Sequence, residues 1–471
     1  MLKQLNRPWA LVILGASCFH LAYELPILAL LIVGYLAVLA RLTQLENPRH
    51  AFACGLLLGY AVIIPQLWFF AGLFKAGAFT LWTVLAVWIA AFVLLGRSAC
   101  RRWPRWGICL LPVLWTGLEY ARSDLYDLRF AWLTPGLALE DPLWHGWLVA
   151  GQYGFGFGAM LLVVLFMRRP RIAAVAAVAL SLIVSLLPQQ RSPGTPLQIV
   201  GVQVEFPDDT QVVKVLNKAI AQAPDAELVV LPEYTLASDV PETIRDWCRE
   251  HGKYLIIGGK VYIDSSRSEF DNTAFVIGPS GETVFSQVKA VPIQFFNDGR
   301  PAKKQAVWDS PWGKIGIAIC YDFSFSRVID PLVRDGAQLL IIPTMDVIDW
   351  GRHQHELHSR LGPVRAREYG VPVVRAASSG VSQIVSGDGA VLASVPVGQQ
   401  MAPFHATVHL PPQASLPLDR ALIPICALVS LLLSGYLLST AVVRSRLKSS
   451  DTVGTMQGQG TTLPDDYCTR F

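Results

Sequence analysis

The sequence contains few charged residues. Only 16% of its 471 residues are Asp, Glu, Lys or Arg, and 52% are hydrophobic. Soluble domains carry about 25% charged residues, so the composition favours a membrane protein. The net charge of +4 is also small, and the positive side chains lie in short loops between apolar runs. This placement is typical of membrane orientation signals, and we expect no nucleic-acid partner.

The sequence also lacks the motifs of disulfide-rich and metal-binding proteins. Its eight cysteines are scattered without a CxxC pair, which argues against a disulfide framework and a zinc site. The segment HQHELH, residues 353–358, places three histidines at helical spacing, but it has no HExxH pattern and no nearby trio of carboxylates. We interpret it as a solvated helix face, and we expect neither a metal nor another cofactor.

Long apolar runs dominate the N-terminal part of the chain, and one more lies near the C-terminus. Some are shorter than the about 20 residues that a perpendicular membrane helix needs. Lys and Arg fall at alternate ends of successive runs, so the positive-inside rule predicts that both termini are cytoplasmic. The predicted spans are 8–22, 25–40, 51–71, 79–95, 107–121, 147–167, 171–188 and 420–443.

The hydropathy divides the chain into four predicted parts. Residues 1–190 form a transmembrane domain of seven helices, and residues 420–443 form an eighth helix. Between them, residues 196–415 alternate short β-rich runs with amphipathic helical ones, which predicts an α/β sheet covered by helices on the far side of the membrane. The polar residues 444–471 are expected to be a disordered cytoplasmic tail.

Three residues with chemically active side chains each follow a predicted strand. Cys320 ends the apolar run 315–319 just before a predicted helix, whose N-terminus stabilises a thiolate. A lone cysteine in such a run is more often a small buried apolar residue. However, Glu233 and Lys289 follow two other β-rich runs, and α/β sheets place their sites at strand ends. The three together favour a catalytic site.

These segments resemble the nitrilase, or carbon–nitrogen hydrolase, superfamily, whose catalytic residues are Glu, Lys and Cys in that order. The matching segments are LPEYT, VFSQVKAVP, GIAICYDFSFSRVIDPLVRDGAQLLIIPT and RAREYGVPVVRAASSGVS. The resemblance implies an α-β-β-α sandwich in which Cys320 attacks an acyl carbonyl. It further implies that Glu233 is the general base and that Lys289 stabilises the oxyanion, roles that suit these side chains.

The apolar segments narrow the resemblance. AFACGLLLGYAVIIPQLWFF, PVLWTGLEYAR and FAWLTPGLALEDPLWHGWLVAGQYGFGFGAMLLVVLF are similar to the membrane portion of bacterial apolipoprotein N-acyltransferases. The resemblance implies a multi-pass protein of the bacterial inner membrane with a periplasmic catalytic domain. It implies a phospholipid as acyl donor, a thioester on Cys320, and a diacylated apolipoprotein as acceptor, acylated on the α-amine of its S-diacylglyceryl-cysteine.

A thioester must be shielded from water, so the approach to Cys320 is expected to be apolar. Phe295 and Phe296 in PIQFFNDG, and Trp350 in IDWGRH, are candidates for loops that cover the site or enter the lipid. Ordinary packing is the alternative interpretation of these three aromatic side chains.

The chain departs from the family pattern beside the catalytic residues. The family has a supporting Glu after its Lys, whereas KAVPIQFFND lacks it. Gln294 is the nearest candidate for this role, and Asn297 or Asp298 is close enough to fold back. Tyr321 and Asp322 follow the nucleophile where the family favours Tyr-Glu, and we expect both to support it.

Three other functions stay open at this point. A membrane-tethered amidase or hydrolase would release the acyl group to water, and a related transferase would use another amine. A catalytically idle relative would only bind lipid or lipoprotein. The presence of Glu233, Lys289 and Cys320 together argues against an idle protein.

Overall fold

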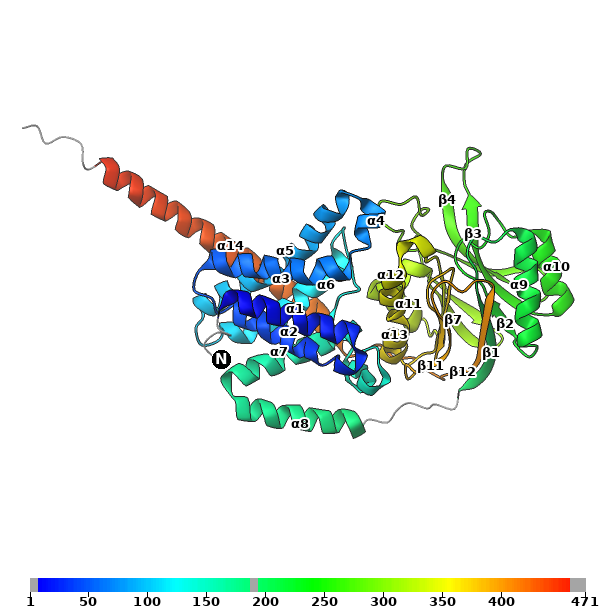
Figure 1. Cartoon of the computed structure of the whole chain (residues 1–471), viewed down its shortest axis with the longest axis horizontal. Coiled ribbons are helices and arrows are strands. Elements are labelled where there is room, and N and C mark those ends of the chain that lie inside the picture. The colour runs from blue at the N-terminus through cyan, green and yellow to red at the C-terminus, as the bar shows by residue number, and fades with distance from the viewer. Residues whose placement is uncertain (1–6, 187–193, 458–471) are drawn as a thin grey trace, which may run out of the picture.

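The computed structural model of the chain describes residues 7–186 and 194–457. It contains two parts that pack against each other (Figure 1). The first, which we call the helical region, comprises residues 7–186 and the C-terminal helix. The second, which we call the sandwich, comprises residues 194–418. Because the sandwich is inserted between membrane helices, both of its ends connect to the helical region.

Each range that we predicted as a membrane span overlaps at least one helix of the helical region, and the range 51–71 overlaps both α3 and α4; residues 187–188 lie outside the described residues. Short 3₁₀ or π turns interrupt the region at η1 (Pro26–Leu28), η2 (Gly107–Leu110), η3 (Ala121–Leu125), η4 (Pro135–Ala138) and η5 (Pro142–Ala150). The helices are α1 (Pro8–Glu24), α2 (Leu31–Leu42), α3 (Pro48–Gln66), α4 (Phe70–Phe74), α5 (Gly77–Arg102), α6 (Leu111–Tyr120), α7 (Gln152–Arg168), α8 (Pro170–Leu186) and α14 (Asp419–Gln457).

Three helices within the described residues are long and apolar enough to cross a membrane, namely α3, α5 and α14. The pair η5 and α7 adds a fourth span if the two, which are bent by 88°, are counted together. The chain is therefore a membrane protein with three to four clear spans, and the total of eight stays a prediction.

Helix α14 is longer than the predicted span. It continues past the predicted span 420–443 to Gln457, and the disordered cytoplasmic tail of residues 444–471 stays a prediction. The polar composition of this segment prevents burial in a core, but it does not prevent the continuation of a helix that is already formed. Residues 458–471 lie outside the described part of the chain.

The sandwich contains two six-stranded sheets, with strand orders β12-β1-β2-β3-β4-β5 and β11-β10-β9-β8-β7-β6. In each sheet the central strands are parallel and the outer strands are antiparallel. The strands are β1 (Thr195–Gln203), β2 (Leu228–Val230), β3 (Tyr254–Tyr262), β4 (Phe270–Ile277), β5 (Thr283–Val288), β6 (Val307–Ser310), β7 (Gly313–Ile317), β8 (Leu339–Thr344), β9 (Val373–Ala377), β10 (Ser382–Val385), β11 (Val391–Val395) and β12 (Ala402–Leu410).

The sheets pack face to face because alternate strand residues are apolar. Ile315 and Ile317 of β7 face the same core as Ile199 of β1 and Val230 of β2, as the two-residue period of a strand requires. Helices cover the two outer faces (Figure 1), so the predicted α-β-β-α sandwich is confirmed. They are α9 (Asp209–Gln222), α10 (Glu242–His251), α11 (Ser326–Arg334), α12 (Arg352–Ser359) and α13 (Leu361–Tyr369), with short turns η6 (Cys320–Ser324) and η7 (Ile348–Trp350).

Helices α11, α12 and α13 lie between the second sheet and the helical region (Figure 1). One apolar core continues across this boundary, and it includes Trp132 of the helical region together with Phe325 and Leu361 of the sandwich. Hydrogen bonds also cross it, among them those from Trp132 Nε1 to Ser324 Oγ at 2.9 Å and from the Tyr321 hydroxyl to the Arg129 carbonyl at 2.9 Å. The catalytic half of the sandwich therefore has a fixed position against the membrane helices.

A buried arginine joins α14 to this boundary. Arg420 forms ion pairs with Asp330 of α11 at 2.9 Å, Glu368 of α13 at 3.1 Å and its neighbour Asp419 at 2.6 Å. The Asp419 carboxylate also accepts hydrogen bonds from the first backbone N–H groups of α7, at Tyr153 and Gly154, both at 3.1 Å. This network therefore ties the two sides of the boundary together.

We expect Arg420→Met to destabilise the protein, because Asp330 and Asp419 would lose their buried cation and Glu368 would keep only Arg365. Removing one partner of a buried ion pair costs about 3–5 kcal/mol. The free energy of unfolding in detergent measures this loss. The matched control is Arg352→Met, whose partner Glu356 is on the surface and whose side chain is 82% exposed. It is expected to cost below about 1 kcal/mol, and equal losses in both variants would contradict the role of the network.

Candidate active site

Cys320 is held in an unusual backbone conformation at the end of the β7 segment. Its φ is +52°, a left-handed value that costs a non-glycine residue about 1–3 kcal/mol. The side chain is 1% exposed, and its Sγ lies 3.7 Å from the Met345 carbonyl. Cys320 is the first residue of the short turn η6, and the predicted helix, α11, begins only at Ser326. The thiol therefore projects from a sharp turn rather than from a long helix.

Asp322 stabilises this turn and ties it to the loop that follows Lys289. Its carboxylate accepts hydrogen bonds from the backbone N–H groups of Ile319 at 3.1 Å, Ala290 at 3.0 Å and Val291 at 2.6 Å. Burial raises the pKa of Asp322 to about 6, although Lys289 and the three N–H donors favour the charged form. Asp322 thus positions the nucleophile relative to the lysine.

Glu233 lies at the end of the β2 segment with both carboxylate oxygens occupied. Oε1 accepts from Lys289 Nζ at 2.9 Å and from Asn272 Nδ2 at 2.6 Å. Oε2 accepts from the Met345 backbone N–H at 2.8 Å. The loop sits directly on Gly258 of β3, where a Cβ would lie 2.6 Å from the Glu233 Cα. Glycine at this position therefore lets the carboxylate approach the site.

Lys289 has a second carboxylate partner, which comes from the loop that lacks the glutamate of the family pattern. Its fully buried Nζ lies 2.7 Å from Asp298 Oδ2, and Asp298 also accepts from the Tyr234 hydroxyl at 2.7 Å. The expectation for Gln294 was wrong, because its amide instead donates to the Asp127 carbonyl at 3.1 Å. The left-handed φ of +71° at Phe295 marks the turn through which the loop returns Asp298 to the lysine.

The electrostatics of the site favour a protonated thiol and a charged lysine. Burial raises the pKa of Cys320 well above its ordinary value, and the Glu233 carboxylate adds to this effect. Burial alone would lower the pKa of Lys289, but Glu233 and Asp298 together raise it. Burial also raises the pKa of Glu233, against the opposing effect of Lys289. The thiol consequently needs a base to become a nucleophile, and Glu233 is a carboxylate in the same site.

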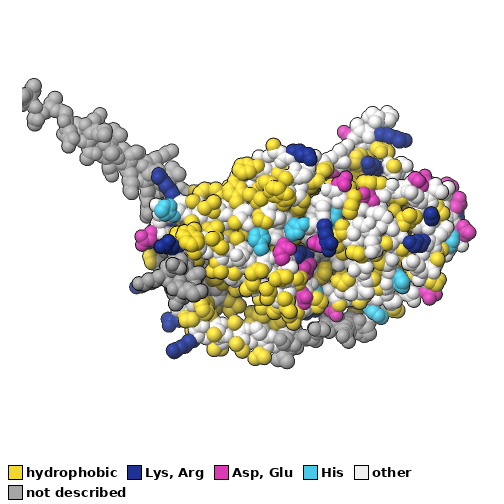
Figure 2. Space-filling model, in the orientation of Figure 1, with side chains coloured by type: hydrophobic (Ala, Val, Ile, Leu, Met, Phe, Trp, Pro, Cys, Tyr) yellow, Lys and Arg dark blue, Asp and Glu magenta, His cyan; other side chains and the backbone are white. Residues whose placement is uncertain are grey.

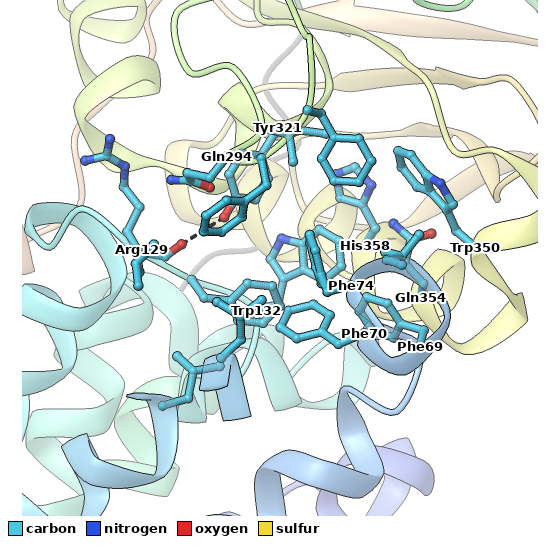
Figure 3. A pocket seen from close by; sticks show the side chains of 18 of the residues that line it. Phe69, Phe70, Phe74, Arg129, Trp132, Gln294, Tyr321, Trp350, Gln354 and His358 are labelled. Carbon is cyan, nitrogen blue, oxygen red and sulfur yellow. Dashed lines mark hydrogen bonds between the residues drawn. The ribbon is translucent and has the colours of Figure 1, made fainter. Parts of the chain in front are cut away.

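Cys320 is among the residues that line a cavity at the boundary between the sandwich and the helical region. Figure 3 shows other residues of this lining, including Trp132, Tyr321 and His358. The cavity, which we call the Cys320 cavity, has a volume of about 820 Å³, including its open mouth. Its lining is mostly aromatic and aliphatic: Phe69, Phe70, Leu73, Phe74, Leu81, Val84, Leu85, Leu128, Arg129, Phe130, Trp132, Ile293, Gln294, Phe295, Phe296, Cys320, Tyr321, Trp350, Gln354 and His358. It therefore connects the Cys320 thiol to helices α4 and α5 of the helical region.

The structure places Phe295, Phe296 and Trp350 together at this cavity. Phe74 of α4 contacts both phenylalanines, with ring centroids 5.9 and 5.8 Å apart, and Phe296 lies 6.1 Å from Trp350. The Phe295 side chain remains 69% exposed. The sequence interpretation missed the partners in the helical region, including Phe74 and Trp132. For Phe74 and its neighbours, the sequence signal is the run of aromatic residues in WFFAGLF, residues 68–74.

Comparison with known proteins places the two parts of the chain in one family. The model of the carbon–nitrogen hydrolase domain matches residues 197–401, and the model of the apolipoprotein N-acyltransferase N-terminal domain matches residues 13–165. An apolipoprotein N-acyltransferase of Geobacter metallireducens is 25% identical over 84% of this chain and 88% of its own length. The chain belongs to the apolipoprotein N-acyltransferase family.

Other matches extend the family assignment. The apolipoprotein N-acyltransferase of Shewanella oneidensis is 25% identical and covers 82% of this chain and 86% of its own length. Omega-amidase NIT2-B of Xenopus laevis is 32% identical over 127 residues, 24% of this chain and 44% of its own. The crystal structure of Saccharomyces cerevisiae Nit3, a nitrilase superfamily member, has 20% identity and a TM-score of 0.39, covering 46% of this chain and 90% of that chain. The apolipoprotein N-acyltransferases thus match the chain over both of its parts.

The histidine segment of this N-acyltransferase is not the solvated helix face that the sequence suggested. His355 and His358 are 0% and 2% exposed, and both face Asp346, with Nδ1 atoms 3.8 and 2.9 Å from its carboxylate oxygens. Helix α12 lies between the second sheet and the helical region, so the face that carries His355 and His358 is covered. Among the described residues, no group of His, Cys, Asp and Glu has the arrangement of a metal site.

We expect Asp298→Asn to reduce catalysis strongly, because it removes one of the two charges that hold the Lys289 ammonium. The rate of acyl-enzyme formation should fall by about 10²–10³-fold, the range for loss of one preorganised electrostatic group. The control is Gln294→Ala in the same loop, which should change the rate by less than about threefold. A larger loss of rate in Gln294→Ala than in Asp298→Asn would instead indicate that Gln294 supports Lys289.

Proposed function

We propose that this enzyme transfers a fatty acyl chain from a phospholipid to the α-amine of S-diacylglyceryl-cysteine at a lipoprotein N-terminus. The observation that supports this most directly is the Cys320 cavity. Its apolar lining comes from α4 and α5 as well as from the sandwich, and Cys320 forms part of its wall. An acyl chain from the bilayer therefore has an apolar site that ends at a buried thiol.

In the first half of the reaction, Glu233 takes the proton of the Cys320 thiol, and Sγ attacks the ester carbonyl of the phospholipid. Negative charge develops on the carbonyl oxygen, and the Lys289 ammonium stabilises it. The carbon–oxygen bond to glycerol then breaks, and Glu233 returns the proton to the glycerol oxygen. A lysophospholipid leaves, and the acyl chain remains on Cys320 as a thioester.

In the second half, the acceptor amine attacks the thioester carbonyl and Cys320 leaves as the thiol. Water competes with the amine at this stage. The burial of Cys320 and the apolar lining of its cavity restrict water, whereas a lipid-anchored amine is concentrated at the membrane surface. These features favour transfer over hydrolysis.

The proposal includes an orientation in the bacterial inner membrane. The sandwich is periplasmic, both termini are cytoplasmic, and eight helices cross the bilayer. Side chains of Lys and Arg gather at the end of the helical region farthest from the sandwich (Figure 2), as the positive-inside rule requires of the cytoplasmic end. Two basic loops meet there, since Arg168 donates to the Arg105 carbonyl at 2.6 Å.

The thioester is tested with a phospholipid that carries a labelled acyl chain. We expect label on Cys320 in the wild type, no label in Cys320→Ala, and labelling about 10²–10⁴-fold slower in Glu233→Gln, the range for loss of a general base. Addition of a diacylglyceryl-cysteinyl peptide should discharge the label and yield an N-acylated peptide. Equally fast discharge without the peptide would indicate a hydrolase, and an unlabelled wild type would refute both enzymatic functions.

Labelling should also slow in acid. Asp322 has a pKa of about 6, raised by burial, and burial raises that of Glu233 as well. Both groups act as carboxylates. Protonation of Asp322 as the pH falls through about 6 weakens its hydrogen bonds to the turn, and protonation of Glu233 in acid removes the base. A labelling rate that stays constant down to pH 5 would contradict these roles.

The cavity predicts a change in acyl-chain preference. Val84 lines it from α5, so Val84→Phe should shorten the space and disfavour long acyl donors. Each methylene that no longer fits is expected to cost about 0.8 kcal/mol, or about fourfold in relative rate. Competition between donors of different chain length measures the ratio. The control is Val87→Phe on the same helix, because Val87 is 41% exposed and lies outside the cavity lining. The same change in chain-length preference in both variants would indicate that the acyl chain does not bind in this cavity.

A further inference from the structure

A buried histidine–aspartate pair lies beside the catalytic residues. His358 of α12 has its Nδ1 at 2.9 Å from Asp346 Oδ1. Trp132 stacks on the imidazole, with ring centroids 4.7 Å apart and planes inclined by 17°. Asp346 also forms a close ion pair with Arg375 of β9 and accepts from Gln354 Nε2 at 3.2 Å. The ring is therefore fixed in both position and orientation.

The second nitrogen of this ring has no protein partner. His358 Nε2 is buried and makes no hydrogen bond to the described residues. The ring nitrogens point in different directions, so with Nδ1 bound to Asp346, Nε2 points away from that carboxylate. His358 lines the same cavity as Cys320 (Figure 3). A buried polar atom without a partner is costly, and its placement beside a nucleophile indicates a functional role.

The charges around the ring favour a neutral imidazole with its proton on Nδ1. Nδ1 lies 2.9 Å from Asp346 Oδ1 and 3.0 Å from Arg375 Nη2. We assign its proton to the contact with Asp346, because Arg375 already pairs with the same carboxylate, and this assignment leaves the lone pair on Nε2. Burial lowers the pKa of His358, and the Asp346 carboxylate opposes this effect. Arg375, which lies 3.0 Å from Nδ1, lowers the pKa further, and so does His355. Across the cavity, the titratable or charged residues are Cys320, Tyr321 and Arg129. The ring is thus a base in its resting state.

The second half of the reaction needs such a base. An α-amine with a pKa of about 8 is mostly an ammonium at neutral pH, and an ammonium has no lone pair with which to attack. Conversion of an ammonium to an amide releases two protons. One of them restores the Cys320 thiol through Glu233, which is a carboxylate again after the lysophospholipid has left. The other proton needs a different acceptor.

We propose that His358, held by Asp346, is the base that deprotonates the ammonium of the acceptor before it attacks the thioester. The inference rests on the proposed function. One N–H bond of the ammonium breaks, its electron pair stays on nitrogen, and the proton moves to His358 Nε2. The nitrogen then forms a bond with the thioester carbonyl carbon, and the carbon–sulfur bond breaks. Glu233 transfers the second proton from nitrogen to Cys320 Sγ, and His358 releases the first proton to solvent.

The test separates the two halves of the reaction in His358→Asn. Asparagine places an N–H donor near the position of Nδ1 and so retains a partner for Asp346, but it has no equivalent of Nε2. The matched control is His355→Asn, because His355 is equally buried beside Asp346 but does not line the cavity. Each variant is charged with labelled phospholipid and then mixed with the diacylglyceryl-cysteinyl peptide.

We expect His358→Asn to form the acyl-enzyme within about twofold of the wild-type rate and to transfer it at pH 7 about tenfold more slowly, because only about a tenth of an amine with a pKa of about 8 is neutral at that pH. The deficit should shrink to a few-fold at pH 9, where the peptide amine is already unprotonated. Hydroxylamine, an amine that is neutral at pH 7, should discharge both acyl-enzymes equally. His355→Asn should transfer at the wild-type rate.

Three results would overturn the role of His358. They are an unchanged transfer rate at pH 7, a deficit that persists at pH 9 and with hydroxylamine, and a loss of acyl-enzyme formation in His358→Asn alone. The last two would indicate a structural contribution to the cavity. Failure of the wild-type protein to form the acyl-enzyme would instead refute the proposed function itself, so the two failures are distinguishable.

Discussion

The buried ammonium of Lys289 is the charge around which the active site is arranged. It is fully buried between two carboxylates, those of Glu233 and Asp298, and a buried cation without such partners would cost several kcal/mol. Asn272 donates to both carboxylates, at 2.6 and 3.1 Å, so the loops that carry them converge. Asp322 then extends the arrangement to the nucleophile, because it binds the backbone on both sides. Charge compensation thus determines the catalytic geometry.

The sandwich supplies the reactive groups, and the helical region supplies the environment in which they act. The sulfur faces a cavity whose walls include α4 and α5, and it is shielded from water by aromatic side chains from both parts. This division suits a reaction in which the substrate is a membrane component and the intermediate is sensitive to hydrolysis. The same boundary brings His358 against Trp132, so the position of the proposed base also depends on both parts.

The sequence predicted the features that depend on local pattern. The alternating apolar residues of β7 indicated a buried strand, and Glu233, Lys289 and Cys320 each follow such a strand within a recognisable motif. The role of Asp298 depends on a left-handed turn at Phe295, and the amino-acid sequence of the loop does not reveal this turn. The burial of His358 was equally hidden, since helical spacing gives the same pattern whether a face meets water or a neighbouring helix. Contacts across the boundary require the tertiary structure.

The apolar core that continues from the helical region into α11 and α13 affects how the chain is made. The sandwich is synthesised after α1 to α8 and before α14, and domains generally fold in the order of synthesis. The outward faces of α11 and α13 therefore find the membrane helices already available when they emerge. A sandwich released without those helices would present this apolar surface to water, where it favours aggregation. The helical region thus serves as a template for folding as well as an anchor in the bilayer.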